Sequence, residues 1–107
     1  MNTEKLKNIQ RLNDEHRQKG IYLITQGIQA LGNQKVIEIL QAVQNYNDFN
    51  EDNNPYQERD FGDFELDGDT YIWKIDYYDN NEEFLSPDPS DPKVTKRVLT
   101  VMLSYEY

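Results

Sequence analysis

The residues best suited to chemistry lie in one short run, Trp73-Lys74-Ile75-Asp76-Tyr77-Tyr78. Side chains two residues apart on a β-strand share a face, so Lys74, Asp76 and Tyr78 would stand side by side. A lysine, a carboxylate and a phenol could bind a small ligand or move a proton, with Asp60 as a second carboxylate. The plainer interpretation is an ion pair between Lys74 and Asp76 on a half-exposed sheet face. Both interpretations are open at this point.

Carboxylates are too numerous for one acid/base pair to stand out. The segment from Asp48 to Pro92 holds 15 Asp or Glu residues and two bases, Arg59 and Lys74, so its formal charge is −13. The rest of the chain has 5 acids and 9 bases, or +4, which gives the net charge of −9. With so many acids in one segment, some pairs must lie close by chance.

Two familiar kinds of site fail on closer inspection. The run from Asp63 to Asp69 has the first half of an EF-hand calcium loop, but the twelfth position needs a glutamate and is Lys74. The only histidine, His16, cannot form a multi-histidine metal site, and a place on the surface of a polar helix is the ordinary interpretation. With no cysteine in the chain, we predict no metal site and no cofactor.

The elements that must position these residues form an α+β set, a small antiparallel sheet of three to four strands packed by two to three helices. The pair Asp67-Gly68 between two alternating runs predicts a hairpin. The predicted elements are helices over 3–19 and 33–46, the second capped by Asn33, hairpin strands over 60–66 and 70–77, a strand over 21–25, a turn over 27–32 and a possible strand over 82–85.

The last segment allows two interpretations. Asp91-Pro92 resembles a helix N-cap followed by a first-turn proline, and the apolar residues from Val94 to Tyr105 recur at helical spacing, which predicts a closing helix. The β-branched run over 98–101 favours a strand instead. The proline-rich segment 86–92 before it is expected to be extended and stiff.

Length and composition limit the setting. A chain of 107 residues predicts a single domain over 1–107. The helix over 3–19 has a thin apolar stripe, so it is expected to be marginal alone and to persist only when docked, and loose docking is one possibility. No apolar run approaches the ~20 residues that span a bilayer, and no secretory leader is visible, so we expect a cytoplasmic protein. A net charge of −9 disfavours direct contact with nucleic acid or a membrane surface. The oligomeric state is not predicted.

Several motifs together carry a resemblance that covers nearly the whole chain. They are Leu12-Asn13-Asp14 with Arg17, Asn53-Asn54-Pro55-Tyr56 with Glu58 and Asp60-Phe61-Gly62, the run from Trp73 to Asp79, Ser86-Pro87-Asp88-Pro89 with Asp91-Pro92, and the run from Arg97 to Leu103 with Glu106-Tyr107. In these the chain resembles the bacterial domain-of-unknown-function family numbered 3768, which implies no mechanism. The chain differs from the family pattern at Arg59, where the family commonly has a histidine. If that position balances the charge of nearby acids, as we favour, an arginine serves the same role.

The sequence supports two functional hypotheses, of which we favour the first. In the first, the protein has no catalytic residues and is an interaction module or inhibitor, of the nucleic-acid-mimic or anti-CRISPR-like kind, that binds a basic, nucleic-acid-binding protein. In the second, it is an enzyme or small-ligand module centred on Lys74 and Asp76, with Asp60 and Tyr78. The first places the partner-binding surface on Asp48, Glu51, Asp52, Glu58, Asp67, Asp69, Asp88 and Asp91.

Overall fold

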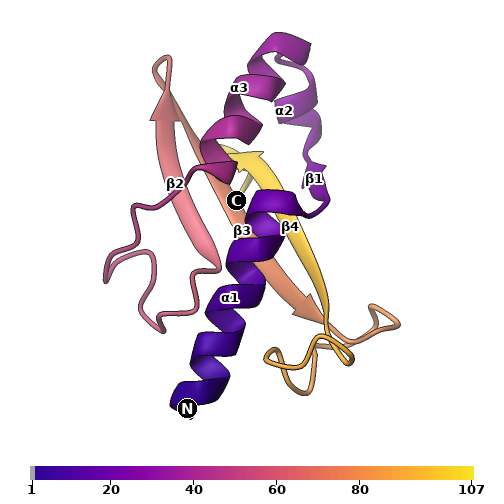
Figure 1. Cartoon of the computed structure of the whole chain (residues 1–107). Coiled ribbons are helices and arrows are strands. Elements are labelled where there is room, and N and C mark those ends of the chain that lie inside the picture. Colours follow the sequence, from indigo (N-terminus) through magenta and orange to yellow (C-terminus); the bar gives the residue numbers. More distant parts are fainter. Residues whose placement is uncertain (1) are drawn as a thin grey trace.

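An open sheet with helices against one of its faces makes up the computed structural model, which describes residues 2–107 (Figure 1). The strands are β1 (Tyr22–Ile24), β2 (Phe61–Leu66), β3 (Asp69–Tyr78) and β4 (Lys96–Leu103), in the order β1-β4-β3-β2. The helices are α1 (Thr3–Lys19), α2 (Gln26–Gln29) and α3 (Asn33–Gln44), followed by a 3-10 turn, η1 (Ser104–Glu106). The α+β class expected from the sequence is confirmed. β2, β3 and β4 are antiparallel, and β1 joins β4 in parallel.

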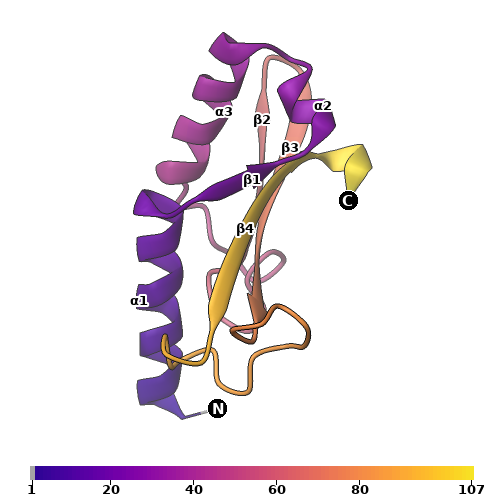
Figure 2. The same ribbon diagram turned by 90° about the vertical axis from the view of Figure 1, so that its right-hand side faces the viewer.

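The two faces of the sheet differ in what covers them. Figure 2 shows α1 and α3 along one face, which we call the inner face. Neither of these two helices lies against the other face, which we call the outer face. The core lies on the inner face and follows strand alternation, because every second residue of a strand points the same way. Its buried members are Ile28, Ile39, Val43, Tyr46, Tyr71, Trp73, Ile75, Leu99, Val101 and Leu103.

The predicted hairpin is confirmed. β2 and β3 are joined by Asp67 and Gly68, with φ of 53° and 88°, and Leu66 pairs with Asp69. Two central residues with positive φ are the mark of a tight turn whose twist matches the strands, and glycine adopts this conformation without strain. The carboxylates of the candidate calcium loop are thereby spread along two strands and their turn.

The closing helix is the one large error of the sequence interpretation. Residues 96–103 form β4, which pairs along its whole length with β3, from Tyr71↔Leu103 to Tyr78↔Lys96. The physical reason is that β3 needs a partner for its backbone on the side away from β2, a demand that helical spacing within one segment cannot reveal. The β-branched residues that favoured the alternative, a strand, fit this half-buried position.

The segment before β4 also differs from the prediction. Residues 86–92 turn back on themselves instead of running straight, with the Asp91 N–H bonded to the Asp88 carbonyl at 3.0 Å. Asp91 caps a turn, since its carboxylate accepts the Lys93 N–H at 2.9 Å, and no helix follows. Residues 82–85 give only an isolated bridge, Leu85 with Tyr78.

Both long helices are placed as predicted, with one difference at a cap. α1 spans Thr3–Lys19, and the Asn2 side chain caps it by accepting the Glu4 N–H at 2.8 Å. α3 begins at Asn33 itself, and the preceding Gly32 has a φ of 91° that suits glycine. The expected turn over 27–32 contains the short helix α2, capped by Thr25. Within residues 2–107, no helix has the length and apolar character to cross a membrane.

Candidate functional site

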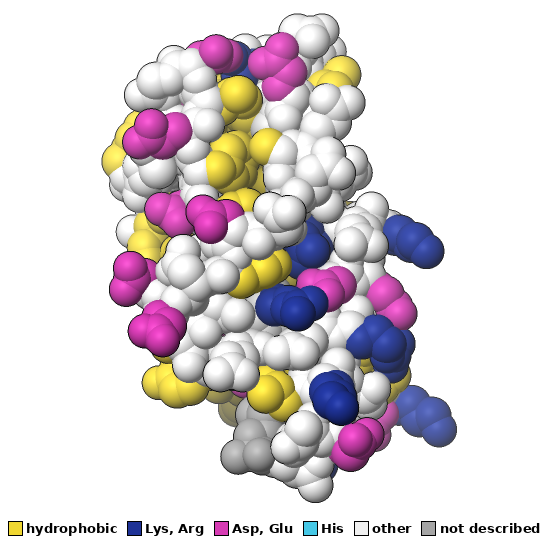
Figure 3. Space-filling view, turned by 60° about the vertical axis from the view of Figure 1, so that its left-hand side comes forward, with side chains coloured by type: hydrophobic (Ala, Val, Ile, Leu, Met, Phe, Trp, Pro, Cys, Tyr) yellow, Lys and Arg dark blue, Asp and Glu magenta, His cyan; other side chains and the backbone are white. Residues whose placement is uncertain are grey.

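One edge of the sheet gathers exposed acids from three neighbouring segments. They come from the loop before β2, from β2 itself and from the hairpin turn, and we call them the acidic edge: Asp48, Glu51, Asp52, Asp63, Glu65, Asp67 and Asp69. Figure 3 shows Asp and Glu side chains running down one side of the molecule, while Lys and Arg gather at its lower right. Within residues 2–107, the ion pairs of these acids are limited to one, between Asp67 and Lys35. Most of this charge is therefore unbalanced by neighbouring bases.

Local hydrogen bonds shape the loop that carries part of the acidic edge. The Asn50 side-chain oxygen accepts the N–H groups of Asp52 and Asn53, at 2.9 and 3.1 Å. The Asn53 amide in turn donates to the Asp48 carbonyl at 2.8 Å and to the Tyr46 hydroxyl at 2.9 Å. Asparagine is well suited to such turns, since its side chain can replace backbone partners. The loop thus presents Glu51 and Asp52 outward from a hydrogen-bonded frame.

A hollow of about 370 Å³ lies within this acidic edge. Asp52 and Asp63 stand at it, and its apolar wall is formed by Phe61 and Ile72, with Asn50 and Asn53 completing the lining. A carboxylate rim above an apolar wall is complementary to a long basic side chain, which buries its methylene groups and keeps its charge at the rim.

A second group of polar residues lies under α1 on the inner face, and sequence reasoning missed it. We call it the inner cluster: Asn13, Glu58, Tyr77 and Arg97. The Asn13 amide donates to the Glu58 carbonyl at 2.9 Å and to the Tyr77 hydroxyl at 2.8 Å. The Tyr77 hydroxyl donates to the Glu58 carboxylate at 2.8 Å, and Arg97 Nε donates to the Asn13 oxygen at 2.7 Å. Glu58 therefore faces inward, although the sequence placed it on the partner-binding surface.

The inner cluster ties together segments that are far apart in the sequence. Arg97 also donates to the carbonyl of Pro89 and lies over the Tyr77 ring, 5.2 Å from its centroid. Asn13 is fully buried, and burial is the main cause that raises the pKa of Tyr77 well above its usual range. The hydroxyl consequently stays protonated, so it serves as a hydrogen-bond donor to Glu58.

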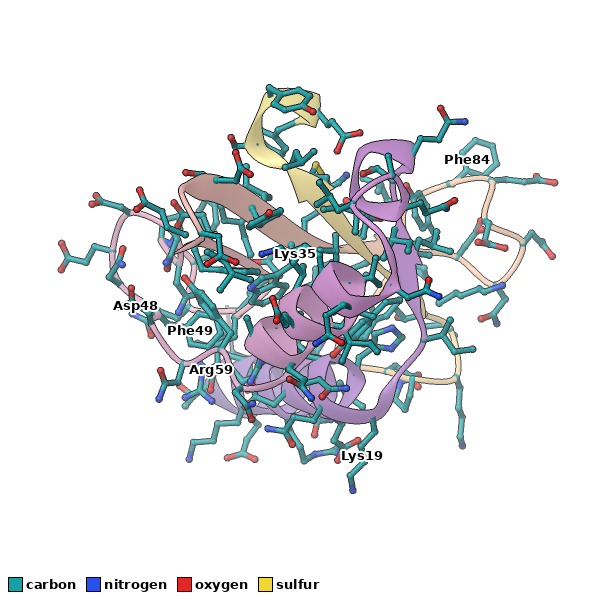
Figure 4. All side chains as sticks on the ribbon, turned by 90° about the horizontal axis from the view of Figure 1, so that it is seen from above. Lys19, Lys35, Asp48, Phe49, Arg59 and Phe84 are labelled. Atoms are coloured by element: carbon teal, nitrogen blue, oxygen red, sulfur yellow. The ribbon has the colours of Figure 1, made fainter. Side chains whose placement is uncertain are left out.

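Two arginines beside the inner cluster share one carboxylate. Asp14 bonds Arg17 at 3.0 Å and Arg59 at 2.7 Å. Both guanidinium groups also lie near the Phe49 ring, at 5.3 and 6.0 Å from its centroid, and Arg17 lies 5.6 Å from that of Trp73. Figure 4 shows Asp48, Phe49 and Arg59 together on one side of the molecule. Arg59 is thus ion-paired with Asp14, which fits a charge-balancing role at this position.

The residues of the alternative site lie mostly on the outer face. Lys74 Nζ is 2.8 Å from the Asp76 carboxylate, with the two side chains 35% and 32% exposed, and the hydrogen bond to Asp76 raises the pKa of Lys74. Tyr78 follows on the same face, since it pairs with Lys96 while Asp76 pairs with Val98. Asp60 immediately precedes β2, and burial, followed by Glu58 and Asp76, raises the pKa of its carboxyl group. This geometry is that of an ion pair on a half-exposed sheet face.

The two remaining acids of the predicted surface lie away from the acidic edge. Asp88 accepts the N–H and hydroxyl of Ser90 at 3.1 and 2.6 Å, and stands 3.8 Å from Lys5 of α1. Asp91 caps the turn described above. These contacts shape the segment before β4, so its acids do not join the loop and the hairpin turn on one surface.

His16 stands at the end of α1, where its ring Nε2 donates to the Ile21 carbonyl at 3.1 Å, and burial is the first cause lowering its pKa. It lines a surface hollow together with Lys19 and Arg97. Within residues 2–107, no group of three or more His, Asp or Glu side chains is arranged to hold a metal ion.

Comparison with known proteins gives one match. A family model described as protein of unknown function, DUF3768, matches residues 24–106. It is the family that the sequence motifs indicate, although the motif over 12–17 lies before the matched residues. Glu58, Tyr77 and Arg97 of the inner cluster come from three motifs within the match, and Asn13 comes from the motif before it. No curated protein and no solved structure matches the chain.

Proposed function

The chain belongs to the DUF3768 family of proteins of unknown function, and from that premise we propose that it is a protein-interaction module without catalytic activity. Its acidic edge binds the basic surface of a nucleic-acid-binding protein and competes there with nucleic acid. An inhibitor of the anti-CRISPR-like or nucleic-acid-mimic kind is the form of this function that fits best. The observation that carries the proposal is the alignment of exposed, mostly unpaired acids along one edge of the sheet.

Several of the acids elsewhere in the chain are ion-paired, unlike most acids of the acidic edge. Asp14, Glu15, Asp76 and Glu82 each pair with a base at 3.0 Å or less. Unpaired carboxylates gathered on one side of the molecule create a negative potential that steers a basic partner and helps to orient it. The basic surface of a nucleic-acid-binding protein binds negatively charged phosphates, and the carboxylates of the acidic edge present the same sign of charge.

The hollow at Asp52 and Asp63 adds a place for an anchor. Interfaces gain most of their affinity from a few side chains that fill pockets, and arginine is prominent among them. An arginine of the partner would lay its stem against Phe61 and Ile72 and reach both carboxylates. The charge of the acidic edge would then speed association with the partner, and the filled hollow would slow dissociation.

The test is affinity capture from the native host at low salt, with elution at high salt and identification by mass spectrometry. A variant with Glu51→Lys and Asp52→Lys is expected to lose the partner that the unchanged chain captures. The matched control carries Glu4→Lys and Glu83→Lys, two exposed acids away from the acidic edge, and has the same net charge. It should keep the partner.

A second step addresses competition directly. The captured partner is loaded with its nucleic acid, and release is measured as the protein is added. Displacement that weakens steeply with salt is expected. Equal capture by both charge variants, or a partner that binds the protein and its nucleic acid together without interference, would refute the proposal.

A further inference from the structure

We propose that the other edge of the sheet, β1, is a self-association surface on which a second copy of this chain adds its own β1. The two copies would pair antiparallel about a twofold axis at Tyr22, so that the two sheets become one. The inference concerns β1 alone and does not depend on the function proposed for the acidic edge.

The two edges of the sheet are built differently. β2 places Asp63 and Glu65 on its exposed positions, and charged residues on an edge strand discourage pairing with another chain. β1 and its flanks, Gly20 to Thr25, contain no charged residue. Instead Ile21 and Leu23 are 82% and 55% exposed. An uncharged, apolar edge is the type that recruits a further strand.

In the described part of the chain, the backbone of β1 has no strand beside it on the side away from β4. Its strand partner within residues 2–107 is β4 alone, from Tyr22↔Leu99 to Ile24↔Val101, so its other side has no strand beside it. Figures 1 and 2 show β1 at the margin of the sheet with no helix or strand in front of it. Side chains reach this backbone at its ends, His16 at the Ile21 carbonyl and Gln29 at the Ile24 carbonyl.

The spacing of the exposed residues is self-complementary. Leu23 lies on the outer face, because it pairs with Thr100, which pairs with Lys74. Ile21 is two residues earlier and shares that face by strand alternation. In an antiparallel pair centred on Tyr22, Ile21 stands opposite the partner copy's Leu23, and Leu23 opposite its Ile21. All four exposed apolar side chains then form cross-strand pairs, and the same patch serves both copies.

Charge also favours this edge over the rest of the surface. A net charge of −9 makes two copies repel each other in general. Beside Ile21 and Leu23, however, a hollow of about 590 Å³ is lined by His16, Lys96 and Arg97, with Glu82 as its one acid. Two copies that approach through β1 therefore meet away from the acidic edge.

The size of the contact sets the expected strength. Stable complexes bury about 800 Å² per partner, and pairing so short a strand covers much less. We therefore expect a reversible dimer that forms at roughly 10–100 µM protein, and one in which both acidic edges stay at the far ends of the joined sheet.

The first test measures mass against concentration by sedimentation equilibrium. The unchanged chain should move from monomer toward twice that mass across this range. The double variant Ile21→Lys, Leu23→Lys puts like charges opposite each other, so the transition should move to at least ~10-fold higher concentration. The control Tyr56→Lys, Tyr105→Lys changes two residues that are 81% and 80% exposed elsewhere, and should associate as the unchanged chain does. Thermal melting confirms that both variants fold.

The second test fixes the register. Because the chain has no cysteine, Ile21→Cys and Leu23→Cys each introduce a single thiol. Mixing the two variants under mild oxidation should give the mixed disulfide between the two variants in excess over either homodimer, since directly opposed residues lie within disulfide reach. A chain that stays monomeric at all concentrations overturns the proposal, as does association that the lysine variant leaves unchanged or thiol pairing at the random ratio.

Discussion

β3 carries polar groups on both of its faces, and the two sets have different roles in the fold. On the inner face, Tyr77 joins the inner cluster, which links α1, the loop before β2, and β4. On the outer face, Lys74 and Asp76 pair with each other across two positions of one strand. The first set holds segments together that are up to 84 residues apart, whereas the second adds nothing to the connections between elements.

Because the inner cluster is more buried than the outer ion pair, its contacts should contribute more to the free energy of unfolding. A buried polar group that loses its partner costs roughly 1–3 kcal/mol because water cannot replace the bond, and networks lose several bonds at once. An ion pair between half-exposed side chains contributes about 0–1 kcal/mol, since both charges keep much of their hydration. The two faces of β3 should therefore respond very differently to substitution.

The largest effect is expected for Asn13→Leu. The amide serves three partners, and its loss leaves the Glu58 carbonyl and Arg97 Nε without their bonds in a buried place. We expect the free energy of unfolding, measured by urea titration, to fall by about 3 kcal/mol.

Gln10→Leu is the matched control for that substitution. Gln10 also lies on α1, and its amide also donates to a loop carbonyl, that of Gln57, but at an exposed position. Its loss should cost less than about 1 kcal/mol. Equal losses for the two variants would mean that the inner cluster is no more than a set of ordinary surface contacts.

A smaller effect is expected for Tyr77→Phe, which removes one hydroxyl from the inner cluster. Asn13 and the Glu58 carboxylate each lose a hydrogen bond, while the ring and its packing stay. The expected loss is about 1–2 kcal/mol.

Tyr78→Phe makes the same chemical change on the neighbouring residue, on the outer face, and should stay within about 0.5 kcal/mol of the unchanged chain. Comparing the two variants by urea titration isolates the face of the strand as the variable. A Tyr78 variant that loses as much as the Tyr77 variant would contradict the distinction between the faces.

The sequence predicts the outer face far better than the inner one, and the reason is distance along the chain. The Lys74–Asp76 pair follows from strand alternation over three residues. The hairpin turn likewise follows from a local signal, the adjacent pair Asp67-Gly68. Asn13 and Arg97 meet only once β4 pairs with β3 and α1 packs over them, and local patterns do not show that pairing. One local signal did exist: Ile9, Asn13 and Arg17 recur at four-residue spacing and are the buried residues of α1.

The same limit explains the acidic edge and the error at β4. The sequence showed that the charge is concentrated, but not that Glu58 turns inward, because that outcome depends on Tyr77, 19 residues later. The contact between Asp88 and Ser90 spans two residues, so it is a local turn that the expectation of an extended segment overlooked. The pattern over 96–103 fits a helix and a strand alike. The need of β3 for a second strand partner, which lies 18 to 32 residues away from it in the paired positions, decides between them.

A pH-dependent effect is expected at Asp60, whose carboxyl group feels the charges of Glu58 in the inner cluster and of Asp76 on the outer face. Its folded-state pKa is raised, chiefly by burial, so the folded protein holds this proton more tightly than the unfolded chain does. The stability it contributes is fully present below the unfolded pKa of about 3.9 and is lost as pH rises through the folded pKa.

Asp60→Asn should therefore be more stable than the unchanged chain at pH 7, and the advantage should shrink as pH falls toward 3. Urea titrations at several pH values measure this. Asp63→Asn, at an exposed position on β2, removes one carboxylate charge in the same way and is the control for the change in net charge. An advantage of Asp60→Asn that is the same at all pH values would mean that ionisation of Asp60 is not its cause.

The smallest effect is expected for the outer ion pair, and it is also the sharpest test of the comparison. In a double-mutant cycle with Lys74→Met and Asp76→Asn, the coupling free energy should be below about 1 kcal/mol and should decrease with salt, because both side chains are about one-third exposed. A coupling above about 2 kcal/mol that salt does not screen would place the pair in a desolvated setting like that of Asn13. It would then be energetically equivalent to the inner cluster, and a ligand site centred on Lys74 and Asp76 would become the better explanation of the outer face.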